Sequence, residues 1–471
     1  MNKKRLAGFV CLAVAVGLNV AIVRSIGGGE TVYYRIAALW NDAWGKPQRL
    51  AAASPPPIIN QNAGPAPMSE AEARSFLQRA EEGDRYAQFR VGVIYYNGLG
   101  GFPKSAPEAV KYYKLAADRG EWKAQFNLGY LLHNGAVGVP RNDAEALRYM
   151  ILAAEQNDLM AQKTLAGLYR NGEGDIPKNP GESAHWYQRA AENGDTFALS
   201  MIGYYYESGE GGLPKDALRA AANYRNAADK GDGYSAARLG LMYLDGADGI
   251  ERDRGRAMAQ FERAERANSP RADGILGWLY AGGHPGIDKD ENRAAQFYKR
   301  GAEGGDAWSA AGVFDYYAQG KGGLPRDQAL ALKYLQQAAD GDIAPAQRRL
   351  GWLLEHGFGV PKDEEKAAAL YRRAAEQGDA DATDFLGAMI QDGRGGQDRN
   401  EAEAIRLYRQ ASEGDSVKAM YDIGLMYDYG LGGEAKNPDQ AMIWYRKAAA
   451  AGYGPAKRYL AAIAVKASPA P

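Results

Sequence analysis

The chain of 471 residues has almost no cysteine and very little histidine. Its single cysteine, Cys11, excludes an intrachain disulfide framework and any site built from several cysteine ligands. The four histidines do not recur at one position of a repeated pattern, which argues against a row of metal sites: His133, His185, His284 and His356. The sequence therefore predicts neither a metal nor a cofactor.

The chain also lacks an excess of charge of either sign. Lys and Arg total 57, Asp and Glu total 58, and the net charge is −1. A nucleic-acid-binding protein would carry a basic surplus, so we expect no nucleic-acid partner. Because 46% of the residues are hydrophobic and the net charge is small, the composition also excludes disorder of the whole chain.

Signatures of common catalytic sites are missing as well. The sequence contains no Ser-x-x-Lys, no His-Glu-x-x-His, no Gly-x-Ser-x-Gly and no phosphate-binding loop that ends in Gly-Lys-Ser/Thr. Residues 288–292 have the first ligand spacings of a calcium loop, but Arg293 and Lys299 stand where that loop needs Gly and Glu. We therefore predict no catalytic residues and no enzymatic activity.

Residues 1–26 have the composition of an export signal. Three basic residues at positions 3–5 precede Leu6–Val23, whose only strongly polar member is Asn19. This order favours an orientation that sends the rest of the chain across the membrane. The length suits both an uncleaved signal anchor and a cleaved signal peptide, and both remain open. We expect a single-pass inner-membrane protein with a periplasmic C-terminal region or, alternatively, a soluble periplasmic or secreted protein.

Residues 27–68 are predicted to connect this segment to the rest of the chain. Residues 31–44 space their apolar and aromatic side chains for one face of a helix, which would lie either at the membrane surface or against the main body. Residues 53–67 contain five prolines among polar neighbours, a composition typical of a semi-rigid linker.

Glycine, in contrast, is abundant, and it recurs at a nearly constant interval. One glycine, usually in a Leu-Gly-like motif, appears at steps of 35 to 39 residues: Gly92, Gly129, Gly167, Gly203, Gly240, Gly277, Gly312, Gly351, Gly387 and Gly424. A period of this length over ten copies is typical of a solenoid of stacked helical repeats. Glycine within a helix costs about 1 kcal/mol relative to alanine, so its recurrence indicates that two helices cross closely at this point.

Each copy predicts two helices, which we call the first and the second helix. The first ends near another glycine, such as Gly98, and the second begins with an N-cap residue, such as Asn142, three residues before Glu or Gln. A Gly-Asp pair usually ends the second helix and caps the next one, as at residues 83–84, 341–342 and 414–415. An aromatic residue recurs in the second helix and is predicted to fill the core: Tyr113, Tyr149, Tyr187, Tyr224, Phe261, Tyr298, Tyr334, Tyr371, Tyr408 and Tyr445.

These repeats resemble those of Sel1-like repeat proteins, which are related to tetratricopeptide repeats. The resemblance is carried by segments such as 87–98 (AQFRVGVIYYNG) and 367–379 (AAALYRRAAEQGD), and it extends from Ser69 to Val465. It implies an all-α fold, a right-handed α/α superhelical solenoid of about ten helix-turn-helix repeats over residues 69–466, with a tail at 467–471. We expect capping helices at 69–82 and 455–465, and a longer first helix in the repeat around 312–320.

The resemblance also implies where a partner would bind. In tetratricopeptide repeats the first helices line a concave groove, and the residue after the glycine points into it. Transferred to this chain, that position holds a large aromatic residue in every second repeat and aliphatic residues such as Leu168 and Val313 in between. We call the four aromatic residues the aromatic row: Tyr130, Tyr204, Trp278 and Trp352. Tyr and Trp are favoured anchors at protein interfaces.

Other residues of the same face are weaker candidates for partner contacts. A second set of rings lies two turns earlier: Tyr86, Phe197 and Tyr234. The same spacing places polar side chains near the row that could bond an extended ligand: Arg90, Asn127, Ser200, Arg348 and Asp384. The alternative for all the rings is that they pack against the adjacent hairpin.

Sel1-like proteins commonly act as adaptors in signalling, quality control and cell-envelope or exopolysaccharide assemblies. The resemblance therefore implies a non-enzymatic scaffold that binds protein or peptide partners in its groove. From the composition of the N-terminal segment, we expect this scaffold to be attached to the membrane through residues 6–23. The alternative hypothesis is an envelope module that binds peptidoglycan or exopolysaccharide, with sugar rings stacked on the aromatic row.

Overall fold

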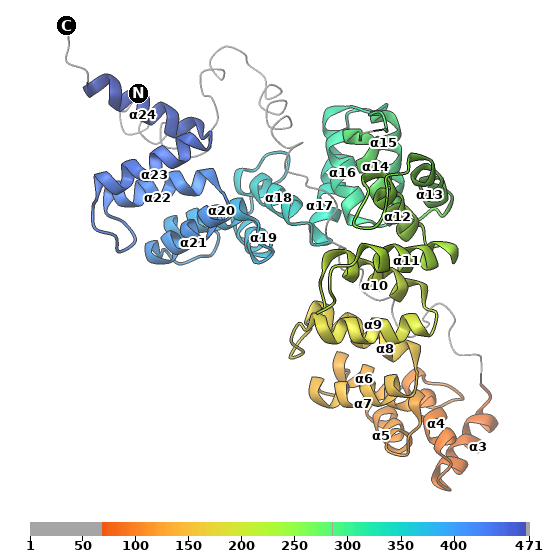
Figure 1. Cartoon of the computed structure of the whole chain (residues 1–471). Coiled ribbons are helices and arrows are strands. Elements are labelled where there is room, and N and C mark those ends of the chain that lie inside the picture. The colour runs from red at the N-terminus through yellow and green to blue at the C-terminus, as the bar shows by residue number, and fades with distance from the viewer. Residues whose placement is uncertain (1–67, 285, 468–471) are drawn as a thin grey trace. The chain divides into compact units, whose positions relative to one another are not determined.

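The computed structural model describes residues 68–284 and 286–467, in which α-helices α3–α24 follow one another through short loops (Figure 1). The predicted export segment, the tail beyond residue 467 and all but the last residue of the predicted linker lie outside the described residues. Among the helices of the described ranges, none has the length and apolar character needed to cross a bilayer.

The described residues form two compact units, each of which is considered by itself. The N-terminal unit contains residues 68–276, 284 and 286–288, and the C-terminal unit contains residues 277–283 and 289–467. The division falls within α14 (Pro270–Gly282).

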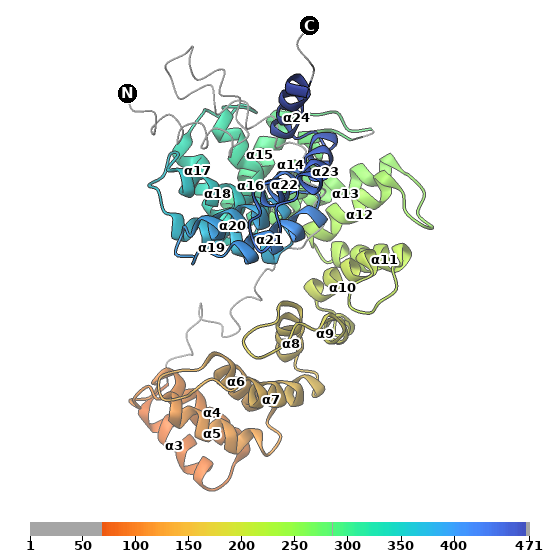
Figure 2. The ribbon, with the colours of Figure 1, turned by 90° about the vertical axis from the view of Figure 1, so that its left-hand side faces the viewer.

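The N-terminal unit begins with a lone helix, α3 (Glu70–Glu81), as predicted for the capping segment. Its first helices are α4 (Arg85–Asn97), α6 (Trp122–Asn134), α8 (Leu159–Asn171), α10 (Thr196–Ser208) and α12 (Gly233–Asp245). Its second helices are α5 (Ala106–Ala117), α7 (Asp143–Glu155), α9 (Pro180–Glu192), α11 (Ala217–Asp229) and α13 (Arg254–Arg266). Each first helix packs on the second helix of its own repeat and on the preceding one, as α6 does on α7 and α5 (Figure 2).

The C-terminal unit repeats this arrangement and ends with the predicted closing helix, α24 (Gly454–Ala467). Its first helices are α16 (Ala307–Gln319), α18 (Ala344–His356), α20 (Ala380–Asp392) and α22 (Val417–Tyr429). Its second helices are α15 (Glu291–Glu303), α17 (Gln328–Asp340), α19 (Glu364–Glu376), α21 (Glu401–Glu413) and α23 (Pro438–Ala450). Because hairpins contact chiefly their neighbours along the chain, the predicted all-α solenoid is confirmed.

The prediction of a longer first helix around residues 312–320 is wrong. α16 has 13 residues, like α14 before it and α18 after it. Gly312 is the sixth residue of its helix, whereas Gly351 is the eighth of α18 and Gly387 the eighth of α20. The long step from Gly312 to Gly351 therefore reflects a displaced glycine within a helix of ordinary length.

The helix glycines lie where two helices approach most closely. A Cβ atom at Gly203 would lie 2.7 Å from Cδ1 of Tyr224, and one at Gly240 would lie 2.6 Å from Cε1 of Phe261. Both rings belong to the second helix of the same repeat and are almost fully buried. In these repeats, the structure confirms that the second-helix rings form the core and that two helices cross closely at the glycine.

The helix caps follow the predicted chemistry with two exceptions. Asn142 accepts a hydrogen bond from the Glu145 N–H, as a capping residue should. The pairs at 341–342 and 414–415 were expected to place Asp at the N-cap, but Ile343 and Ser416 hold that position. Asp342 and Asp415 have φ angles of 60° and 65°, so each aspartate occupies the left-handed position that glycine takes in the other pairs.

Candidate partner-binding surface

The four residues of the aromatic row occupy the same place in their helices. Each is the ninth residue of a first helix, and each side chain is half-buried. Tyr130 and Tyr204 belong to the N-terminal unit, and Trp278 and Trp352 to the C-terminal unit. Since the second-helix rings are buried, the row differs from the core rings in keeping part of its surface exposed.

Each of three rings of the row is held by residues close to it in the chain. The ring of Tyr130 lies 6.4 Å from that of Phe126, and the Tyr204 hydroxyl donates to Oε1 of Glu210 at 2.8 Å. Burial and this hydrogen bond raise the pKa of Tyr204, so the hydroxyl keeps its proton. Trp352 stacks on Phe358 with 5.3 Å between centroids, and Phe358 is 50% exposed. Each of these three rings therefore has a contact within its own repeat.

Two of the aliphatic residues expected between the members of the aromatic row were predicted one or two residues out of place. Leu168 and Val313 are buried, and the ninth helix residues are Gly167 and Asp315. The glycine used to align these two repeats sits at a shifted position in its helix, so counting from it selects the wrong neighbour.

The three rings of the second set differ in how much of their surface is exposed. Tyr86 is 43% exposed and meets Phe76 edge to face at 6.5 Å. Phe197 is half-buried against Tyr187. Tyr234 is buried, with the Arg271 guanidinium 4.5 Å from the ring centroid, and it belongs to the packed interior.

Three of the predicted polar contacts are buried, and two of them pair with residues of neighbouring repeats. Ser200, Arg348 and Asp384 are buried. Nε of Arg348 lies 3.0 Å from Oδ1 of Asp379, which caps the next first helix, and Asp384 pairs with Lys418 of the following repeat at 2.7 Å. Arg348 and Asp384 therefore stabilise the junctions between repeats instead of facing an extended ligand.

A relay of amides between repeats was missed by the sequence analysis. Nε2 of Gln347 donates to the carbonyl of Ala339 at 3.1 Å, and its Oε1 accepts from Nε2 of Gln377 at 2.8 Å. The same bonds recur at Gln125 and Gln162. The sequence contains a signal for this relay, because a glutamine is the fourth residue of each of these three first helices.

A buried polar cluster joins two consecutive loops of the N-terminal unit. Asp143 accepts hydrogen bonds from Nε of Arg141 at 2.9 Å and from the N–H of Asp175 at 2.8 Å, and its Oδ1 lies 2.7 Å from Nδ1 of His133. Burial alone would raise the pKa of Asp143, but these partners outweigh burial and lower it to about 2. In the described ranges, no cluster of His, Cys, Asp and Glu is suited to hold a metal ion.

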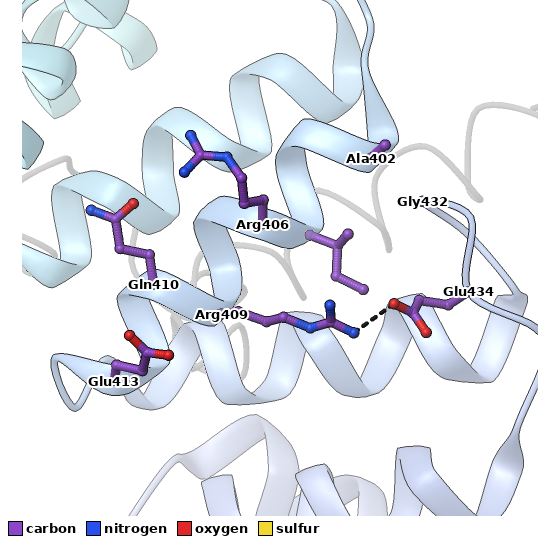
Figure 3. A pocket seen from close by; sticks show the side chains of 8 residues that line it. Ala402, Arg406, Arg409, Gln410, Glu413, Gly432 and Glu434 are labelled. Carbon is purple, nitrogen blue, oxygen red and sulfur yellow. Dashed lines mark hydrogen bonds and ion pairs between the residues drawn. The ribbon is translucent and has the colours of Figure 1, made fainter.

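A hollow of about 510 Å³ lies between α21 and the loop that follows α22 (Figure 3). Arg406 and Arg409 line it, and both guanidinium groups are engaged. Arg409 pairs with Glu434 at 2.5 Å, and Arg406 pairs with Glu403 at 2.6 Å. Because these arginines already have carboxylate partners, the hollow does not present two uncompensated cations to a ligand.

The comparison with protein families matches the repeats observed in the structure. The model of the Sel1 repeat matches ten segments, which together make up most of the chain: 85–121, 122–158, 160–195, 196–232, 233–269, 274–306, 309–342, 344–379, 380–416 and 417–453. The chain belongs to the Sel1 repeat family. Sel1 repeat proteins generally act as protein-binding scaffolds and are typically not enzymes.

Solved structures that match this chain include other Sel1 repeat proteins. The antigen c5321 of uropathogenic Escherichia coli, described as displaying an SLR fold, is 28% identical, with 85% of this chain and 84% of that chain covered and a TM-score of 0.48. A Sel1 repeat protein from Oxalobacter formigenes is 27% identical, with 67% and 90% covered and a TM-score of 0.41. A search of curated proteins gave no match.

Proposed function

We propose that this Sel1 repeat protein is an exported, membrane-anchored scaffold that binds protein partners through its first helices and has no catalytic activity of its own. The assembly it serves would be in the cell envelope or related to exopolysaccharide. Export and anchoring are supported by the apolar segment 6–23 and the basic residues before it. A C-terminal tag should resist protease until the outer membrane is opened, and the N-terminal peptide should be retained if the segment is an anchor.

The observation that carries the proposal is the contrast between two sets of rings in the same repeats. Rings of the second helices, such as Tyr149 and Tyr371, are almost fully buried. Rings of the aromatic row are only half-buried, although they are equally large. Large aromatic side chains, Trp and Tyr above all, are enriched among the residues that anchor protein interfaces. Packing within the solenoid accounts for the rings of the second helices, whereas part of the surface of the aromatic row stays available to a partner.

The glycan alternative requires aromatic rings with open faces. Trp352 has Phe358 and His356 stacked on it, with 4.7 Å between the centroids of Trp352 and His356. Tyr234, in the second set, is buried. These contacts favour a protein partner, and recovery of a glycan without protein would reverse that preference.

The proposal is tested by comparing the proteins crosslinked to matched variants in the native cell. Tyr130→Ala/Tyr204→Ala changes the row in the N-terminal unit, and Trp278→Ala/Trp352→Ala changes it in the C-terminal unit. Leu218→Ala/Ile443→Ala removes exposed apolar side chains from second helices and serves as the control. We expect specific partners to be lost from at least one row variant and kept by the control, with helix content unchanged. Equal recovery from all variants would contradict the proposal.

A further inference from the structure

The first helices of the C-terminal unit carry an excess of acidic residues. α16, α18, α20 and α22 contain seven Asp or Glu and three Lys or Arg. In the N-terminal unit, the first helices α4, α6, α8, α10 and α12 contain two acidic and six basic residues. The acidic excess is therefore a property of one unit and not of the repeat pattern.

Two of the three basic side chains of these helices are each shared by two carboxylates. Arg348 pairs with Asp379 and Asp381, and Lys418 pairs with Asp384 and Asp422. The side chains of Arg348 and Arg349 are 11% and 6% exposed. Among the acidic ones, Asp381 is 47% exposed and Asp392 is 58% exposed. Arg394, from the loop after α20, pairs with both Asp392 and Glu355, and it does not cancel the excess. The charge that this surface presents to solvent is therefore negative.

Partly exposed apolar side chains accompany these carboxylates on α20 and on α22, which contacts it. Phe385 and Ala388 on α20 and Leu425 on α22 are half-buried, and Tyr429 at the end of α22 is 67% exposed. We call Asp381, Phe385, Ala388, Asp392, Leu425 and Tyr429 the acidic–apolar surface.

The chain itself shows how a cation is held beside this surface. Nζ of Lys418 lies 2.7 Å from Oδ2 of Asp384 and 2.6 Å from Oδ2 of Asp422. The same ammonium lies 5.7 Å from the centroid of the Phe385 ring. Two carboxylates and an aromatic face thus surround one cation, which is a favourable arrangement for Lys or Arg.

Asp384 adds an observation that is independent of the charge count. Its side chain is fully buried and its carboxylate points at Lys418, yet its Oδ1 has no hydrogen-bond partner. A buried polar atom without a partner is costly and is often found at a functional site. Lys418 therefore satisfies only one of the two oxygens of the Asp384 carboxylate.

We propose that the acidic–apolar surface of α20 and α22 is a docking site for a basic segment of a partner protein, in which Lys or Arg side chains alternate with large apolar ones. This inference rests on the proposed scaffold function and names the chemistry of the partner. Asp381 and Asp392 already lie 3.3 Å from Arg348 and Arg394, but they are 47% and 58% exposed, so the basic side chains of the segment pair with their exposed surface. The apolar side chains of the segment cover Phe385, Leu425 and Tyr429.

The test uses the full-length protein and a fluorescent peptide that repeats Lys-Leu-Arg-Phe-Gly-Ser, with a second peptide in which Glu replaces both basic residues. We expect the basic peptide to bind, the acidic one not to bind, and Asp381→Asn/Asp392→Asn to weaken binding by about tenfold at low salt. Tyr429→Lys, a change at an exposed side chain, should weaken binding similarly. Glu365→Gln/Glu376→Gln removes two exposed carboxylates from α19 and should leave affinity unchanged.

Several results would overturn the inference. These are equal binding of both peptides, no binding of the basic peptide, or the same loss of affinity in the α19 control. A wild-type dimer that Asp381→Asn/Asp392→Asn converts to a monomer would assign the surface to a second copy of the chain instead. If the basic peptide fails but the aromatic-row variants lose their partners, this inference falls and the scaffold function stands. If the peptide binds as expected while the row variants keep their partners, the aromatic row is wrong and this docking site stands.

Discussion

At the scale of single residues, the helix glycines determine how closely the two helices of a repeat can pack. The Cβ that Gly240 lacks would overlap the buried ring of Phe261, whereas a Cβ at Gly255, in the partner helix α13, would meet only Oδ1 of Asp253 at 3.4 Å. Two glycines in one hairpin thus differ in role: the first is required by packing and the second is not.

Gly240→Ala should lower the free energy of unfolding by about 1 to 2 kcal/mol. The ring must move to admit the methyl group, which costs more than the gain in helix propensity of about 1 kcal/mol. Gly255→Ala is the matched control and should leave stability unchanged or raise it slightly. Urea unfolding followed by circular dichroism measures both, and equal stability of Gly240→Ala and wild type would contradict this account.

Asp143 makes the stability of the N-terminal unit depend on pH in acid. Its pKa is lowered in the folded chain to about 2, so its contribution is complete above the unfolded value near 4 and is lost as the pH falls through about 2. The shift corresponds to about 2 kcal/mol, since the side chain is almost fully buried. The stability difference between wild type and Asp143→Asn should therefore shrink between pH 4 and pH 2. A difference that stays constant over this range would show that the carboxylate charge is not what matters.

At the scale of helices and hairpins, the sequence predicted where helices begin and end because capping depends on residues close together in the chain. Asn142 begins α7 by accepting a hydrogen bond from the N–H of Glu145, and Gly98 ends α4 by donating one to the carbonyl of Ile94. The same reasoning failed at Asp342 and Asp415, since aspartate can adopt a positive φ and the pair Gly-Asp does not say which member does so. The amide relay was missed because its bonds join residues of different hairpins.

Removal of the relay at one junction should have a local effect. Gln347→Leu leaves the buried carbonyl of Ala339 and the amide of Gln377 without this partner, at a cost of about 1 to 3 kcal/mol. Amide hydrogen exchange should become faster in α17–α19 and stay unchanged in α4–α7, because repeats contact only their neighbours. Gln336→Leu, at an exposed position of α17, is the control. Faster exchange throughout the chain would contradict a local role.

At the scale of the whole molecule, the number of repeats and the all-α fold were predictable because the glycine period is sustained over the chain. The division into two units was not, since Gly277 continues the period through α14, where the division falls. The sequence predicted that Tyr149 is buried, but it left open whether Tyr130 keeps exposed surface or packs against the adjacent hairpin. Tyr149 and Tyr130 are alike in composition, and only packing makes the first buried and the second half-buried.

The central claim is that partners bind on the first helices. It is tested most directly by placing a photocrosslinking amino acid at single positions and illuminating the native cells. Tyr130 and Trp278 represent the aromatic row, one in each unit, and Leu218 and Ile443 represent exposed positions on second helices. The account predicts specific protein adducts from at least one row position and none from the second-helix positions. The same adducts from both sets, or adducts from the second helices alone, would contradict it.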